Sequence, residues 1–264
     1  MTESVVGGRG TSRWRDDTMG VAVPVALVAL AGVGWWWSAR MVDDMDGSGG
    51  MSGMGGMSGQ HALSLGAFLI AWLAMMTAMM FPAISPVVRL YGRVAAAGRV
   101  APLPVFVAGY IAVWTSLSLP AYAAWRALME PVAEGEPWAG RLAGGALLVA
   151  AIWQMTPLKA ICLRHCRSPM SFFMQFGVAA ARPLGALRAG AGHGAYCVGC
   201  CWALMIVLVA VGTMNLMWMA GLALLILLEK NARHGEGIAM AAAAGFALLG
   251  VVLLASPSTL TTLT

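Results

Sequence analysis

The chain has 264 residues, of which 60% are hydrophobic and only 10% are charged. Soluble domains carry about 25% charged residues, so this composition excludes an ordinary soluble domain and favours membrane-spanning helices. The formal net charge of +5 does not indicate nucleic-acid binding, because basic residues of membrane proteins gather on the cytoplasmic side and set the topology.

Apolar runs long enough to cross a bilayer recur along the chain. They lie at about 19–39, 62–81, 102–127, 140–158, 197–213, 215–229 and 237–255. This pattern predicts an all-α fold, a polytopic transmembrane helix bundle. The fifth and sixth runs are continuous, so a tight turn at 212–215 would give seven spans, whereas a single tilted or kinked helix would give six. We prefer seven.

The charges of the connecting segments indicate one orientation. The N-terminal tail, 1–17, carries three arginines and is predicted to lie inside, because Lys and Arg mark cytoplasmic segments. The loop at 40–61 is acidic and is predicted to lie outside. Two later segments, 82–101 and 159–196, carry basic residues and no acidic ones, so both are predicted inside. Membrane lipid would then surround the helices.

The outer loop at 40–61 combines methionine with glycine, serine and aspartate. Met51, Met54 and Met57 recur every three residues in a background too flexible to bury a core, and His61 follows them. Thioethers are soft ligands that select Cu(I). We interpret these four residues as a capture site for that ion; the alternative is a low-complexity linker with incidental methionines.

The second apolar run contains the methionine-rich sequence MMTAMM. Its methionines form two pairs at i, i+4, which gives two adjacent sulfur stripes on a helix. The four residues are Met75, Met76, Met79 and Met80. They suggest a path for a soft metal through the bilayer, although methionine is also a common gap filler between packed helices.

All five cysteines lie on the expected inner side, where thiols stay reduced. Two triplets have the same i, i+3, i+4 spacing, which places each triplet on one helix face, and the second is expected to open the fifth span. The candidate ligands are Cys162, His165, Cys166, Cys197, Cys200 and Cys201, with His193 shortly before the second triplet. Thiolates favour Cu(I), and zinc is the second candidate for this ligand set. Small buried residues in helix packing are the alternative.

Several blocks of the chain match the motifs of a known family. They are AMMTAMMFP at 74–82, QMTPLK at 154–159 with the cysteine segment up to 169, GAYCVGCCWALM at 194–205, MNL at 214–216 and EK at 229–230. Over about 70–235 the chain resembles a bacterial family of predicted metal-binding integral membrane proteins with a domain of unknown function. The resemblance implies a metal site in the inner (cytoplasmic) membrane of a bacterium. It does not extend to the first helix or the outer loop.

We hypothesise a multi-pass protein that passes Cu(I) from the outer methionines to the inner cysteines, by transport or by delivery to a cytosolic metal acceptor. The expected organisation is a cytoplasmic tail at 1–17, a first transmembrane helix at 18–39, an outer loop at 40–61, a transmembrane helical metal-binding domain at 62–255 with an inner loop at 159–196, and a C-terminal tail at 256–264. A homo-oligomer or a larger membrane complex stays open, and no nucleic-acid partner is expected.

Two other classes of function stay open. A structural or assembly subunit of a membrane complex would use the cysteines and histidines as a packing or zinc site. A membrane thiol-disulfide oxidoreductase would use Cys197 with Cys200 or Cys201 as its exchanging pair. No Ser/His/Asp grouping indicates a hydrolase, and under the copper hypothesis the protein is not an enzyme.

Overall fold

The structure is a computed structural model that describes residues 64–260 except 135, 169–173, 176 and 212–215, together with 25, 29, 31–36 and 40. The predicted tail at 1–17, most of the first span and nearly all of the outer loop lie outside the described residues. The four residues expected to capture metal also lie outside the described residues; they are Met51, Met54, Met57 and His61.

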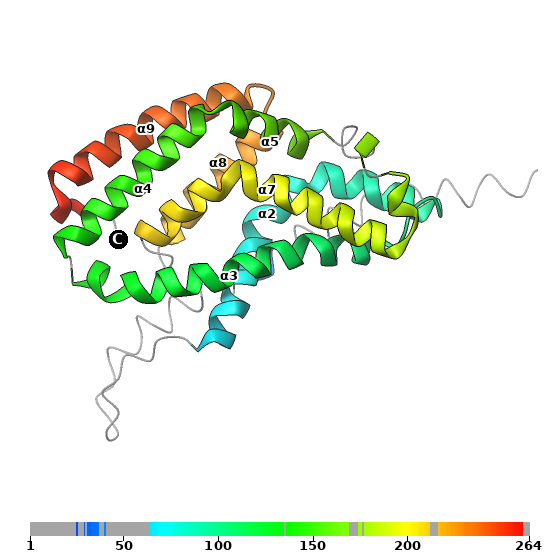
Figure 1. The fold of residues 1–264 in the computed structure, drawn as a ribbon, viewed down its shortest axis with the longest axis horizontal. Coiled ribbons are helices and arrows are strands. Elements are labelled where there is room, and N and C mark those ends of the chain that lie inside the picture. The colour runs from blue at the N-terminus through cyan, green and yellow to red at the C-terminus, as the bar shows by residue number, and fades with distance from the viewer. Residues whose placement is uncertain are drawn as a thin grey trace, which may run out of the picture.

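Within the described residues the chain is a bundle of helices without strands, as predicted (Figure 1). The elements are α2 (Leu65–Ala96), α3 (Leu103–Ala133), α4 (Pro137–Met155), α5 (Pro157–Arg167), η1 (Ala179–Ala181), α7 (Pro183–Val211), α8 (Leu216–Asn231), α9 (Gly235–Ala255) and η2 (Pro257–Thr259). α3 runs beside α7, and α4 beside α9. α2 and α8 pack against each other.

Four of these helices, α2, α3, α7 and α9, are long and apolar enough to cross a membrane. The bent pair α4 and α5 gives a fifth candidate if it counts as one span. α7 ends at Val211 and α8, of 16 residues, begins at Leu216. The turn that the seven-span interpretation requires at 212–215 lies outside the described residues. The total number of spans stays a prediction, because the first span lies mostly outside the described residues.

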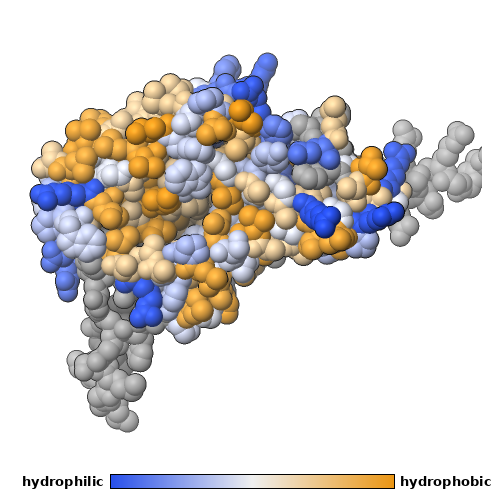
Figure 2. All heavy atoms as spheres, viewed as in Figure 1, coloured by the Kyte–Doolittle hydropathy of each residue, from blue (hydrophilic) through white to orange (hydrophobic). Residues whose placement is uncertain are grey.

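The outer surface of the bundle is apolar. Figure 2 shows hydrophobic side chains over the visible face of α4 and α9, with hydrophilic ones towards the ends of the bundle. Ile152 of α4 is 66% exposed and Leu248 of α9 is 69% exposed. Soluble monomers rarely expose contiguous apolar surface of this kind, whereas lipid-facing helices require it.

Small residues allow α3 and α7 to approach closely. A Cβ atom on Gly109 of α3 would lie 2.1 Å from the carbonyl oxygen of Leu187, and one on Gly190 of α7 would lie 1.9 Å from that of Phe106. Glycine is therefore required at both crossing points. Lipid tails are as apolar as the side chains, so such close backbone packing is a main source of helix association in a membrane.

A sharp bend separates α4 from α5. The two helices meet at an angle of 70°, at Thr156 and Pro157. Pro157 has no backbone N–H and disfavours a helical conformation at Thr156, so α4 ends there and α5 begins. The hydroxyl of Thr156 caps the new helix by accepting from the Lys159 amide at 3.2 Å. The bend turns α5 towards α7 and α8.

The segment 159–196, expected to form an inner loop, is largely helical where it is described. α5 continues to Arg167, and α7 begins at Pro183, well before Cys197. The helix that carries Cys197 therefore begins well before the predicted start of the fifth span, and the limits of that span in a membrane stay a prediction. The first half of α7 is rich in glycine and alanine, which favours a loop in the sequence, but these small residues are the ones that pack against α3.

Candidate metal centre

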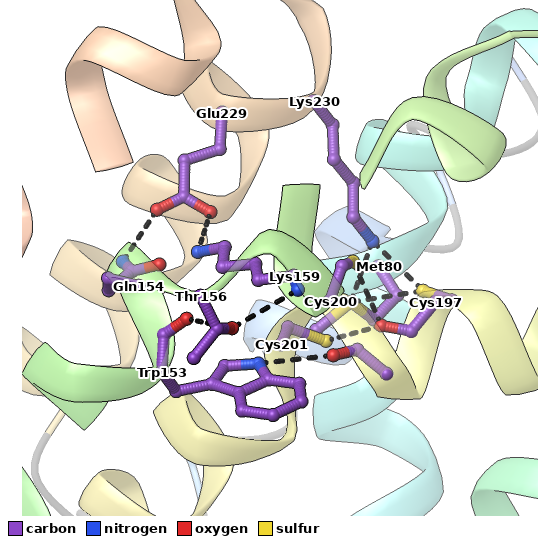
Figure 3. A network of polar contacts seen from close by, with 11 residues as sticks. Met80, Trp153, Gln154, Thr156, Lys159, Cys197, Cys200, Cys201, Glu229 and Lys230 are labelled. Atoms are coloured by element: carbon purple, nitrogen blue, oxygen red, sulfur yellow. Dashed lines mark hydrogen bonds and ion pairs between the residues drawn. The ribbon is translucent and has the colours of Figure 1, made fainter. Parts of the chain in front are cut away.

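Cys197 lies at the centre of the bundle and is fully buried. Its sulfur contacts side chains from three other helices. The Tyr110 hydroxyl of α3 lies 3.1 Å from it, the Lys230 ammonium of α8 lies 2.9 Å from it, and the Met80 sulfur of α2 lies 4.0 Å from it. Figure 3 shows Met80, Cys197 and Lys230 converging. A sulfur, a phenol and a cation thus surround one thiol.

Three more thiols lie around Cys197. Cys166 of α5 is within hydrogen-bonding reach of Cys197 and Cys200, and Cys201 contacts the same two residues. Cys200 and Cys201 also donate to the backbone carbonyl of Cys197, at 3.0 Å and 2.9 Å (Figure 3). We call Cys166, Cys197, Cys200 and Cys201 the thiol cluster. Of the first predicted triplet only Cys166 joins this cluster, whereas all three cysteines of the second triplet do.

The other predicted ligands of the inner side lie around this cluster. Cys162 is partly exposed, and its sulfur packs against Gly199, where an added Cβ would lie 2.9 Å away. The ring of His165 stacks on Tyr196 with centroids 4.7 Å apart. His193 is buried, with the rings of Phe106 and Tyr110 each 6.1 Å away. Its ring reaches Tyr110, which in turn contacts Cys197.

The methionines of α2 are all buried, but they differ in what they contact. Met80 lies against Cys197 and also 3.9 Å from the Lys230 ammonium. Met75, Met76 and Met79 belong to the hydrophobic core of the bundle. The structure therefore brings one thioether of the predicted path to the thiol cluster.

The described residues contain no group of three His, Cys, Asp or Glu side chains that could hold a metal ion as they stand. The thiols of Cys200 and Cys201 turn towards a backbone carbonyl rather than a shared point, and the Lys230 ammonium lies next to the sulfurs of Cys197 and Met80. Rotation of these side chains would be required for metal binding. The donor types, thiol and thioether, are those that suit Cu(I).

Three buried charges near the cluster were not among the predicted site residues. Glu229 of α8 accepts from the Lys159 ammonium at 2.7 Å and from the Gln154 amide at 2.7 Å (Figure 3). Lys230 follows Glu229 and contacts the thiol cluster. The predicted inner loop at 159–196 begins with Lys159, but this residue is only 1% exposed. The sequence contained one indication of these charges, the pair Glu229 and Lys230 at the end of an apolar run. Ionisable residues at membrane depth are candidates for function.

Two further hydrogen bonds hold the bent pair against its neighbours. The indole N–H of Trp153 donates to the Gly199 carbonyl at 3.2 Å, which ties α4 to the cysteine segment of α7. The guanidinium of Arg167 donates to the carbonyl of Ala232, just beyond α8. The bent pair is therefore held through α4 before the bend and through the last residue of α5 after it.

Comparison with known proteins gives one family. A family model described as PpoB2, copper chaperone, matches residues 69–253. The match extends from α2 to α9 and contains every residue of the thiol cluster, and it does not include the outer loop at 40–61. No curated protein and no solved structure matches the chain.

Proposed function

The chain belongs to the PpoB2 copper-chaperone family, and on this premise we propose that it is a membrane-embedded Cu(I) carrier whose thiol cluster holds the ion for an acceptor protein. Family membership makes it a copper-handling protein. The oxidation state of the ion, the residues that hold it and the membrane role are our proposal.

The observation that carries the proposal is the convergence of four thiols and one thioether inside the bundle. Cys166 comes from α5, the other thiols from α7 and Met80 from α2, so three separate helices supply soft donors to one buried region. Cu(I) prefers such ligands to the oxygen donors that bind harder cations. The 70° bend after α4 supports this arrangement, because it directs α5 towards α7.

We propose that the ion moves inwards along donors of increasing strength. The outer methionines and His61 would capture Cu(I), the α2 methionines would pass it on, and the thiolates would hold it most tightly. The contact between Met80 and Cys197 supports the last transfer. A cytosolic acceptor would remove the ion. The proposal requires a protein of a bacterial inner membrane with its N-terminus inside.

Metal analysis of the detergent-purified protein tests the proposal. The protein is prepared anaerobically with Cu(I), beside a variant in which the four cysteines of the thiol cluster are serine. The control is Cys162→Ser, which changes the partly exposed cysteine outside the cluster. We expect about one copper per chain in the parent and in the control, and none in the four-serine variant.

The same measurement separates the other classes of function. Zinc in the parent would overturn the Cu(I) carrier and favour a structural subunit. A disulfide without metal would favour a thiol-disulfide oxidoreductase. Copper retained by the four-serine variant would place the site elsewhere in the chain.

A further inference from the structure

Lys230 occupies an unusual position for a lysine. Its ammonium lies 2.9 Å from the Cys197 sulfur and 3.9 Å from the Met80 sulfur, and the residue is only 5% exposed. Cys197 and Met80 are 4.0 Å apart, sulfur to sulfur. The ammonium therefore lies beside two of the five sulfur atoms that the proposed function uses as metal ligands.

The other buried lysine has a conventional partner. The chain has two lysines, Lys159 and Lys230. Lys159 pairs with the carboxylate of Glu229, which also accepts from Gln154. Glu229 precedes Lys230 in α8 but is directed to the α4–α5 bend, and the Lys230 ammonium contacts the sulfur atoms of Cys197 and Met80 instead. The chain thus places a cation on sulfur although a carboxylate is adjacent in sequence.

Charge balance in the buried region explains why a cation beside the sulfur of Cys197 would be favourable. A thiolate buried without a cation is strongly unfavourable in a medium of low dielectric constant. The Lys230 ammonium lies 2.9 Å from the Cys197 sulfur, where its positive charge would offset the negative charge of a thiolate. Cu(I) is also a monocation, so a thiolate bound to Cu(I) is neutral in the same way. The two cations can replace each other at Cys197 without changing the charge of the buried region.

We infer that Lys230 is a resident cation of the copper-free protein, and that Cu(I) binds by displacing its ammonium from Cys197 and Met80. This inference rests on the proposed function and describes how the same site is loaded and emptied. A copper–sulfur bond forms at Cys197 while the ammonium–sulfur contact breaks, and no electron is transferred. A further thiol of the cluster that joins as a thiolate releases its proton to solvent. On release the ammonium returns, so copper leaves a neutral pair rather than a bare thiolate.

The displaced Lys230 side chain could move to the nearby end of α8. Lys230 is the second-last residue of α8, which ends at Asn231. A lysine has a flexible four-carbon stem that lets the ammonium reach polar surroundings while its backbone stays in place. The last turn of a helix also attracts cations through its free carbonyls. Glu229 stays anchored to Lys159 and Gln154, so only the Lys230 side chain has to move.

Two measurements on the full-length protein in detergent test this inference. The first is Cu(I) affinity, measured by competition with a chromogenic Cu(I) chelator, for the parent, Lys230→Gln and the matched control Lys159→Gln. Removing the competing ammonium should tighten binding by about tenfold to a hundredfold, the range given by loss of one charged hydrogen bond. The control removes the other buried lysine, which contacts Glu229 rather than sulfur. Its loss destabilises the bundle, so the affinity is measured on the folded fraction, where it should stay within about threefold of the parent.

The second measurement needs no variant. The parent is acetylated with an amine-reactive reagent, with and without Cu(I), and the modification of Lys159 and Lys230 is quantified by mass spectrometry. Both lysines are buried in the structure and should react slowly without copper. Copper should accelerate the modification of Lys230 severalfold and leave that of Lys159 unchanged.

The inference requires both results. Weaker copper binding by Lys230→Gln would overturn it, because the ammonium would then stabilise the loaded site. Unchanged protection of Lys230 in the loaded parent would overturn it as well, even if the variant failed to fold. A parent that binds no copper would instead overturn the proposed function itself, which distinguishes the two failures.

Discussion

Replacing Glu229 by glutamine should destabilise the bundle far more than any exposed substitution. The Glu229 carboxylate accepts two hydrogen bonds of 2.7 Å, one from the Lys159 ammonium and one from the Gln154 amide. The variant Glu229→Gln keeps the shape of the side chain but leaves the ammonium without an anion. Breaking a buried pair in this way costs about 3–5 kcal/mol. The amide oxygen can still accept a bond from Lys159, so we expect the lower end, about 3 kcal/mol.

The free energy of unfolding can be measured by titrating the protein from mild detergent into SDS. The signal is the fluorescence of its 11 tryptophans. The exposed residue Glu134 supplies a matched control, because Glu134→Gln should change the free energy of unfolding by less than about 0.5 kcal/mol. The double variant Lys159→Met with Glu229→Gln removes the unpaired cation and should recover most of the loss.

Two results would refute this reasoning. A loss below about 1 kcal/mol in Glu229→Gln would mean that water screens the pair despite the burial of both residues. A double variant no more stable than Glu229→Gln would mean that the loss does not come from the unpaired ammonium of Lys159.

Three further predictions concern packing and metal binding. Gly190→Val should cost at least about 3 kcal/mol in the same titration, because its Cβ would lie 1.9 Å from the Phe106 carbonyl, whereas Gly145→Val, in open space, should change little. Met80→Leu should weaken Cu(I) binding about tenfold in chelator competition, and Met79→Leu should not; equal effects would assign both to packing. Changing the three outer methionines to leucine should lower cellular copper uptake when copper is limiting, and unchanged uptake would exclude capture by Met51, Met54 and Met57.

The helices could be predicted because each depends mainly on its own sequence. Apolar runs gave the positions of α2, α3, α4, α8 and α9 to within a few residues at one end or both. The break before Pro157 follows from a local rule, since proline removes a backbone donor and restricts the preceding residue. The start of α7 at Pro183 did not follow, because its glycines favour a loop until α3 is known to pack against them.

The candidate site could be predicted only in part. The i, i+3, i+4 rule placed Cys197, Cys200 and Cys201 together, because that spacing is a property of a single helix. The same rule predicted that His165 shares a helix face with Cys162 and Cys166, but its ring stacks on Tyr196.

The buried charges depend on partners that are distant in sequence. Lys159 and Glu229 are 70 residues apart, and Met80 and Lys230 are 150 apart. Without the fold, a lysine beside an apolar run cannot be distinguished from a loop charge that sets topology. Burial and pairing therefore had to come from the structure.

The wide spacing of the site along the chain has a consequence for biosynthesis. During translation Met80 is synthesised first, then Cys166 and the α7 cysteines, and Lys230 last, 150 residues after Met80. During this interval the nascent protein carries its sulfur atoms without the cation that accompanies them in the finished bundle. If Cu(I) loads by displacing Lys230, as we propose, controlled loading would begin only after α8 has joined the bundle. A chain truncated before Lys230 would then present its cysteines to metals and oxidants without that cation.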